Sequence, residues 1–224
     1  MLSNAIQNTR ERLTFLKGRN VMFRRLFNLV SLVLLFSLAG TAQADNIWTD
    51  ETGDGLWSTA GNWSLGFVPT FSDSTTVRID ISPGPIVQTA DSGAHKIVFR
   101  GASDLTIDGG TLRVKYDIDG ADSADSVTTM NMISGTLTVN AHCRVAYKGT
   151  GTLNMTGGLI DARDFIIGEQ STTIAHVNLY GGTIINQKNN TFRMGESAGG
   201  IGTMDIRAGA LILDGDNTNV LVEG

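Results

Sequence analysis

The sequence predicts an all-β fold, a right-handed single-stranded parallel β-helix of about five to six coils with an N-terminal cap. Three observations predict it. Glycine-containing turns recur every 23 to 27 residues, apolar and polar residues alternate on both sides of each turn, and a third short alternating segment follows in every repeat. In such a coil each strand pairs with its counterparts about 4.8 Å above and below, so equivalent residues stack on one another.

The turns fix the alignment of the repeats. They lie at Gly109 and Gly110, Ser134 and Gly135, Gly157 and Gly158, Gly181 and Gly182, and Ala208 and Gly209. Two apolar residues with one polar residue between them precede each turn: Leu105 and Ile107, Met130 and Met132, Leu153 and Met155, Val177 and Leu179, Met204 and Ile206. The same spacing follows each turn: Leu112 and Val114, Leu137 and Val139, Ile160 and Ala162, Ile184 and Asn186, Leu211 and Leu213. This alternation is typical of strands with one buried face.

The third segment of each repeat also ends near a glycine. Its expected inward pairs are Ile97 and Phe99, Tyr116 and Ile118, Val145 and Tyr147, Phe165 and Ile167, Phe192 and Met194, and Val220 and Val222. The alternative architecture is an antiparallel β-sandwich. A sandwich does not require equivalent residues to recur at this interval, so the solenoid is favoured.

The N-terminus predicts export. Residues 1–44 are interpreted as a signal peptide, with 22–44 as its functional part: Arg24 and Arg25, an apolar run over 26–38, and small residues ending at Ala44. The apolar run is shorter than the roughly 20 residues of a spanning helix. We therefore expect a secreted, periplasmic or outer-surface protein that begins at Asp45 and has no permanent membrane span.

The mature chain is acidic. Residues 1–44 hold six of the 17 Lys and Arg and one of the 22 Asp and Glu, so 11 basic and 21 acidic residues remain, a net charge of −10. This charge disfavours nucleic acid and anionic polysaccharides as partners. Glycans of other kinds and surface proteins remain as candidate partners. Cys143 is the only cysteine, which excludes an intramolecular disulfide, and we expect it to be a small buried hydrophobe.

Two regions follow the signal: a cap over 45–94 and the repeats over 95–224. The cap holds all three tryptophans, Trp48, Trp57 and Trp63, which we expect to cover the first coil. The other interpretation is a sugar-stacking platform of exposed rings. The last repeat closes at Gly224 with no comparable cover. This predicts end-to-end association, docking of another chain, or a longer natural protein.

The cap carries a resemblance to a known group of proteins. Gly55-Leu56-Trp57 and Asn62-Trp63-Ser64-Leu65-Gly66, with Pro69, Asp73, Val77 and Ile79 and the glycine-turn coils that follow, resemble the opening of autotransporter-type and PEP-CTERM-associated secreted bacterial β-helix proteins. The likeness covers nearly all of the mature chain. It implies an outer-surface stalk, adhesin or matrix component.

Polysaccharide-acting enzymes of the pectate-lyase type also use β-helices, and they need carboxylates and a base on one outward face. The nearest match here is Asp161, Arg163 and Asp164. Asp161 should project outward beside Arg113 and Thr138 with no second carboxylate stacked on it. A solvated bend is therefore the favoured interpretation, and no catalytic residue is assigned.

Two acidic bends are candidate calcium sites: Asp117, Asp119 and Asp122, and Asp214 with Asp216. Both lack the sixth-position glycine and closing Glu of an EF-hand loop, and Asp also favours turns on its own account. The three histidines, His95, His142 and His176, fall in unrelated parts of the repeat. No cofactor is therefore expected, with calcium as the one candidate.

An outward polar column is expected before the turns, formed by Thr106, Asn131, Asn154, Asn178 and Asp205. The three asparagines are candidate ligand-binding residues, and hydrogen bonding along the column is the favoured alternative. Taken together, the pattern predicts a non-enzymatic exported structural or adhesive β-helix. A polysaccharide-acting enzyme and a glycan-binding module are the alternative functions.

Overall fold

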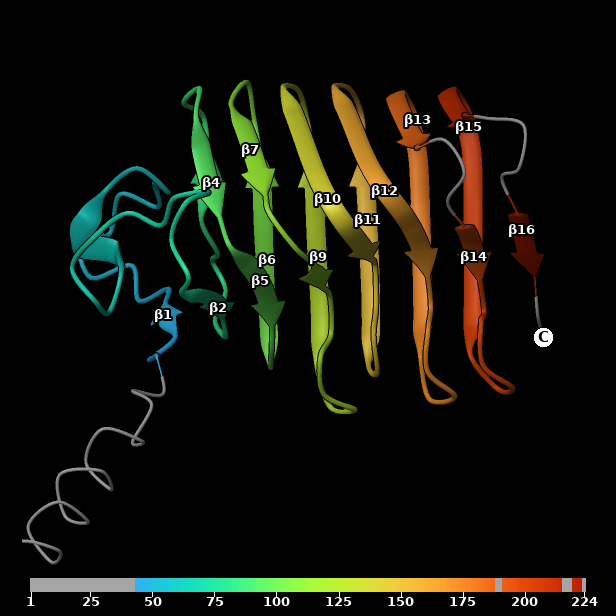
Figure 1. Ribbon diagram of the computed structural model, residues 1–224, viewed down its shortest axis with the longest axis horizontal. Coiled ribbons are helices and arrows are strands. Elements are labelled where there is room, and N and C mark those ends of the chain that lie inside the picture. Colours follow the sequence, from blue (N-terminus) through green and yellow to red (C-terminus); the bar gives the residue numbers. More distant parts are fainter. Residues whose placement is uncertain (1–42, 188–190, 215–218, 223–224) are drawn as a thin grey trace, which may run out of the picture. The chain divides into compact units, whose positions relative to one another are not determined.

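The computed structural model describes residues 43–187, 191–214 and 219–222. These residues form an all-β parallel solenoid of about six coils. Figure 1 shows the coils stacked side by side from the cap to β16. The short 3-10 turn η1, Ala60–Asn62, is the one helical element among the described residues. The fold class predicted from the sequence is confirmed.

The strands form three faces that run along the stack. Face one comprises β3 (Ile86–Val87), β6 (Ala102–Ile107), β9 (Val127–Met132), β11 (Thr150–Met155) and the first halves of β13 (Ile174–Asn186) and β15 (Ile201–Leu213). Face two comprises β4 (Ser92–Ala94), β7 (Thr111–Val114), the first halves of β10 (Thr136–Arg144) and β12 (Leu159–Ile167), and the second halves of β13 and β15. Face three comprises β1 (Asn46–Ile47), β2 (Thr76–Ile79), β5 (Lys96–Phe99), β8 (Ile118–Asp119), the ends of β10 and β12, β14 (Thr191–Met194) and β16 (Asn219–Val222).

The strand pairing confirms the repeat on faces one and two. Leu153 pairs with Met130 on one side and Val177 on the other, and Val177 pairs with Met204. Every pairing between the described strands is parallel, which excludes the antiparallel sandwich. Inward residues of the stacked strands, such as Leu153, lie in one continuous buried core.

Glycine at the turn between faces one and two is required by both backbone conformation and space. Gly158 has φ of +80°, and a Cβ on it would lie 2.7 Å from the carbonyl oxygen of Gly135. Gly182 repeats this arrangement, with φ of +82° and a contact of 2.6 Å to the oxygen of Gly158. The turns therefore stack backbone on backbone, which a side chain would prevent.

On face three the expected alignment is wrong by two residues in two coils. Ile97 pairs with Ile118, and Ile118 pairs with Cys143, so Cys143 stands in the inward column. Tyr116 is instead 47% exposed, and Tyr147 also leaves the core column. In the coil of Cys143, the reason is that β10 runs from face two into face three with only a register shift between Val139 and His142. Its third segment therefore begins earlier than glycine-based alignment suggests.

Stacked strands begin inside the region expected to be a cap. β2, β3 and β4 pair in register with β5, β6 and β7, and β1 pairs with β2, so stacked strands start at Asn46. The three tryptophans are buried in the core: Trp48, Trp57 and Trp63 are at most 2% exposed. The Trp63 ring centroid lies 5.1 Å from that of Trp48 and 4.8 Å from that of Trp57, in edge-to-face contact. Rings buried in this way cannot form a sugar-stacking platform.

Asn62 organises the cap loop that carries the resemblance. It is fully buried, and its Oδ1 accepts hydrogen bonds from the backbone N–H and hydroxyl of Thr52 at 3.0 and 2.6 Å. Its Nδ2 donates to Asp54 Oδ1 at 2.6 Å and to the Leu56 carbonyl at 3.2 Å. Hydrogen bonds from Thr59 and from the Leu56 backbone also lower the pKa of Asp54 to about 2. One buried amide thus closes this loop.

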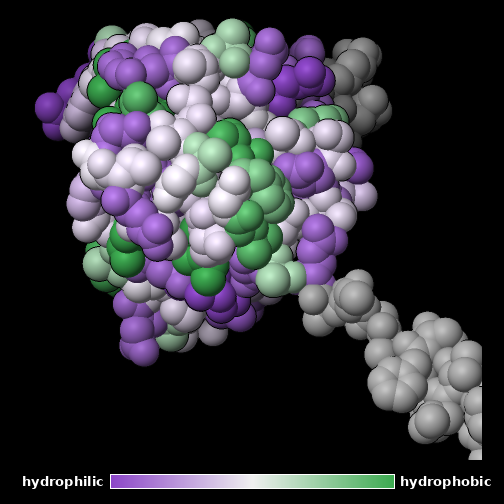
Figure 2. All heavy atoms as spheres, turned by 90° about the vertical axis from the view of Figure 1, so that its left-hand side faces the viewer, coloured by the Kyte–Doolittle hydropathy of each residue, from purple (hydrophilic) through white to green (hydrophobic). Residues whose placement is uncertain are grey.

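Apolar side chains gather on the cap end of the stack (Figure 2). The exposed large apolar residues of the cap loop are Leu65 and Phe67, at 41% and 39%. Among the described residues, no helix combines the length and the apolar character needed to cross a membrane. The predicted signal run over 26–38 lies outside those residues.

Candidate functional site

The densest group of ionisable side chains lies on the outer side of face three and continues onto the strand ends beside it. We call it the inter-coil network. It comprises Lys96, Asp117, Asp119, His142, Arg144, Arg163, Asp164 and Glu169. Its members come from β5, β8, β10, β12 and the segments next to them, so the network spans successive coils.

Arg144 is the centre of the network. Its Nη1 donates to Asp119 Oδ1 at 2.7 Å and lies 3.5 Å from Asp117 Oδ2, while its Nε donates to Glu169. The Arg144 side chain is only 12% exposed. Burial alone would lower the pKa of Arg144, but the hydrogen bond to Glu169 and the surrounding carboxylates raise it above its ordinary value. Arg144 is therefore permanently charged and bridges three carboxylates.

Asp119 is held from both sides along the stack. Its side chain is 6% exposed, Arg144 binds Oδ1 from one coil, and Lys96 Nζ lies 2.6 Å from Oδ2 on the other. A carboxylate buried this far requires paired cations. The burial of Asp119 is thus explained by its ion pairs, which link three coils.

His142 bridges two further carboxylates. Its Nδ1 lies 2.8 Å from Asp117 Oδ1, its backbone N–H donates to the same oxygen at 3.0 Å, and its Nε2 lies 3.4 Å from Asp164 Oδ2. Partial burial acts to raise the pKa of Asp117. The hydrogen bonds from His142 and the charge of Arg144 outweigh it, so this pKa lies well below its usual range.

The candidate catalytic residues do not converge. Asp161 is in register with Thr138 and Ile185, so no carboxylate stacks directly on it, and its Oδ1 accepts from Gln187 Nε2 at 2.9 Å. Arg163 Nε donates to Asp164 Oδ2 at 3.2 Å, and Asp164 also faces His142. The carboxylates of Asp161 and Asp164 therefore contact different residues.

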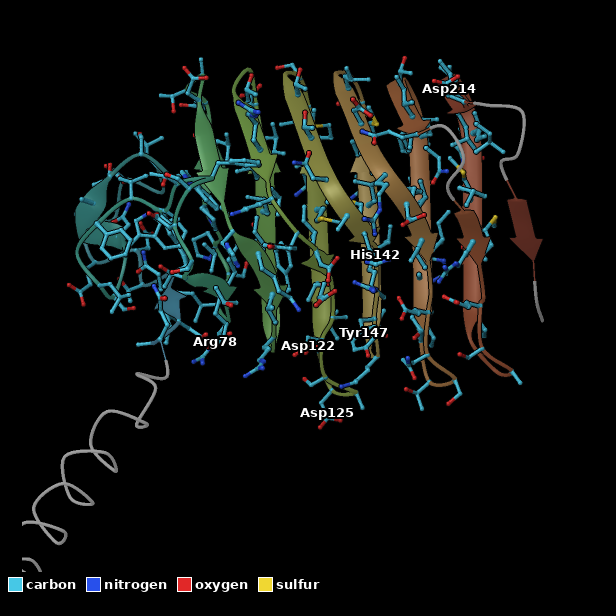
Figure 3. All side chains as sticks on the ribbon, in the orientation of Figure 1. Arg78, Asp122, Asp125, His142, Tyr147 and Asp214 are labelled. Atoms are coloured by element: carbon cyan, nitrogen blue, oxygen red, sulfur yellow. The ribbon has the colours of Figure 1, made fainter. Side chains whose placement is uncertain are left out.

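The carboxylates of the first candidate calcium bend already have side-chain partners within the chain. Asp117 and Asp119 face His142 and Arg144, and Asp122 Oδ2 lies 3.2 Å from Arg100 Nη2. Figure 3 shows Asp122 and Asp214 well apart, so the two bends cannot share an ion. Asp216 lies outside the described residues, and within the described part of the chain no three His, Cys, Asp or Glu residues form a group that could hold a metal.

The histidines are unrelated to one another, as expected. His95 packs against the Tyr116 ring at 4.7 Å, and His176 Nδ1 lies 2.5 Å from the Thr203 hydroxyl. Cys143 is fully buried, and burial raises the pKa of its thiol to about 12. It is therefore a core residue and not a reactive thiol.

The asparagine column on face one forms a hydrogen-bonded ladder. Asn178 Nδ2 donates to Asn154 Oδ1 at 3.0 Å, and Asn154 Nδ2 donates to Asn131 Oδ1 at 3.1 Å. The favoured interpretation, hydrogen bonding along the column, is confirmed. A different asparagine breaks the inward column of face two: Asn186 is fully buried, and its Oδ1 accepts from the backbone N–H of Phe165 at 2.7 Å.

Sequence reasoning missed the inter-coil network because of the register error on face three. With the observed register, one outward column alternates between basic and acidic residue types along the stack: Lys96, Asp117, His142 and Asp164. The neighbouring column brings Asp119 opposite Arg144. Basic and acidic residues alternating at the repeat interval were the available signal. Comparison with known protein families, with curated proteins and with solved structures finds no match to this chain.

Proposed function

We propose that the protein is a non-enzymatic, exported structural element, a stiff rod of the outer-surface or extracellular type that the resemblance suggests. The observation that carries the proposal is the inter-coil network. Asp119 binds Lys96 of one neighbouring coil and Arg144 of the other, at N–O distances of 2.6 and 2.7 Å. Ties of this kind oppose the separation of neighbouring coils, which is the deformation a rod has to resist.

The arrangement of the candidate catalytic groups also supports this role. A polysaccharide lyase or hydrolase needs an acid and a base that can reach the same sugar. Asp161 instead accepts a hydrogen bond from Gln187, and Asp164 lies between Arg163 and His142. These contacts orient the carboxylates toward the protein.

The test uses the full chain, expressed in a bacterial host with its own N-terminus. We expect the protein in the periplasm or medium with Asp45 as its first residue, measured by N-terminal sequencing. Incubated with pectate, alginate, xylan, cellulose and chitin, the purified protein should release no reducing ends and no unsaturated products.

Retention of residues 1–44 on a cytoplasmic protein would contradict export. Release of oligosaccharides that is lost in Asp161→Asn or Arg163→Gln would contradict the non-enzymatic role. Release that persists in both variants and copurifies with the chain would contradict it equally.

A further inference from the structure

The outer surface of face one carries an exposed aliphatic column. Val127, Thr150, Ile174 and Ile201 are in register on successive coils. The three aliphatic side chains are 59%, 40% and 52% exposed, in that order. These aliphatic residues recur at one outward position, with Thr150 between Val127 and Ile174, and form an apolar strip that the described residues leave in solvent.

Two polar columns run parallel to this strip. The nearer one consists of Thr129, Thr152, His176 and Thr203, and the farther one is the asparagine ladder of Asn131, Asn154 and Asn178. An amide group has two N–H donors and two acceptor lone pairs. Asn154 uses one donor and one lone pair within the ladder, so one of each remains for another molecule.

The central part of this surface is uncharged, unlike face three. The outward residues of β9 and β11 are Val127, Thr129 and Asn131, and Thr150, Thr152 and Asn154. Among the outward residues of face one, Asp104 and Asp205 lie on the outer coils. Asp104 accepts from the Gly84 N–H at 3.1 Å, and Asp205 accepts from Arg207 Nε at 2.8 Å.

The size of the apolar strip separates two kinds of partner. Three aliphatic side chains are far too few for a stable protein interface, which buries about 800 Å² on each partner. A polymer that makes the same weak contact on every coil gains affinity by repetition. Sugar rings combine apolar C–H faces with hydroxyl groups that both donate and accept, which matches an apolar strip beside amides and hydroxyls. The net charge of the mature chain, −10 by sequence, disfavours a polyanion.

We propose that the outer surface of face one binds an uncharged polysaccharide chain lying along the axis of the coil stack. The aliphatic column packs against the C–H faces of the sugars, and the remaining amide and hydroxyl groups bind the sugar hydroxyls. This binding goes beyond the structural role proposed above, and a rod that binds no glycan would still fulfil that role.

The test is co-sedimentation of the purified full chain with insoluble cellulose, chitin and β-1,3-glucan. Ile174→Lys places a charge in the aliphatic strip. Ile212→Lys is the matched control, because Ile212 is 44% exposed on the outer surface of face two. We expect binding to at least one of the three polymers that persists in 1 M NaCl, weakened about tenfold or more by Ile174→Lys and unchanged by Ile212→Lys.

Circular dichroism and thermal melting of both variants establish that each is folded. If Ile174→Lys fails to fold, Asn154→Ser replaces it and should also weaken binding. Absence of binding to all three polymers overturns the proposal. So does equal weakening by Ile174→Lys and Ile212→Lys, or binding that 1 M NaCl abolishes.

Discussion

Replacing Arg144 with methionine tests whether the inter-coil network holds the stack together. Methionine keeps most of the volume and removes the charge, which leaves Asp119, 6% exposed, with Lys96 as its remaining cation. Removing one partner of a buried ion pair costs about 3–5 kcal/mol. Because Lys96 stays in place and the Arg144 side chain keeps 12% exposure, we expect a loss of about 2–3 kcal/mol in the free energy of unfolding.

Arg207→Met is a closely matched control. Arg207 also makes an ion pair, with Asp205 at 2.8 Å, and its guanidinium lies over the Tyr180 ring at 5.2 Å, as that of Arg144 lies over Tyr147 at 5.4 Å. The Arg207 side chain is 70% exposed, so its loss should cost less than about 1 kcal/mol. Urea unfolding followed by circular dichroism measures both. If both variants lose the same free energy of unfolding, the buried network around Arg144 does not stabilise the stack more than an exposed ion pair does.

Three further predictions concern single residues. Gly158→Ala should lower the free energy of unfolding by more than the backbone strain of about 1–2 kcal/mol, because its Cβ would lie 2.7 Å from the Gly135 oxygen. Gly66→Ala, at φ of +70°, has open space around its Cβ and should cost the backbone strain alone. Urea unfolding of the two variants measures the difference. Folding lowers the pKa of Asp117, so the stabilisation from its carboxylate is complete above the unfolded pKa of 3.8 and is lost as the pH falls below that value. Asp117→Asn should therefore reduce the acid-induced fall in melting temperature. An identical fall in the variant and the unchanged protein would contradict this. The Cys143 thiol, with a pKa raised to about 12, should not react with a disulfide reagent at pH 8 until urea unfolds the chain, and rapid labelling of the native protein would show that it is accessible.

The sequence was sufficient to predict the stacking on faces one and two. Glycine turns and apolar pairs such as Leu153 and Met155 recur at nearly constant offsets there, and the interval alone aligns them. Face three was aligned less well because the connection from face two varies in length. In β10 that connection is part of the strand, and Cys143 holds an inward position that a search for large apolar residues passes over.

The candidate sites depended on that alignment. The asparagine ladder lies on face one and was predicted at the residue level. The ion pairs of Arg144 lie on face three, and they became visible only once Asp119 was placed opposite it. The role of Asn186 could not be predicted, because the backbone N–H of Phe165 that it binds is 21 positions away in the chain.

The stacked glycine turns make the molecule divisible into coils that follow the same path. Because Leu153 and Met130 occupy the same place in neighbouring coils, deleting residues 130–152 would join Thr129 to Leu153 and set Leu153 directly over Leu105. Each coil therefore adds about 4.8 Å to the length of the stack. Duplication or loss of whole coils would change the length of the stack and would leave the cross-section of the remaining coils unchanged.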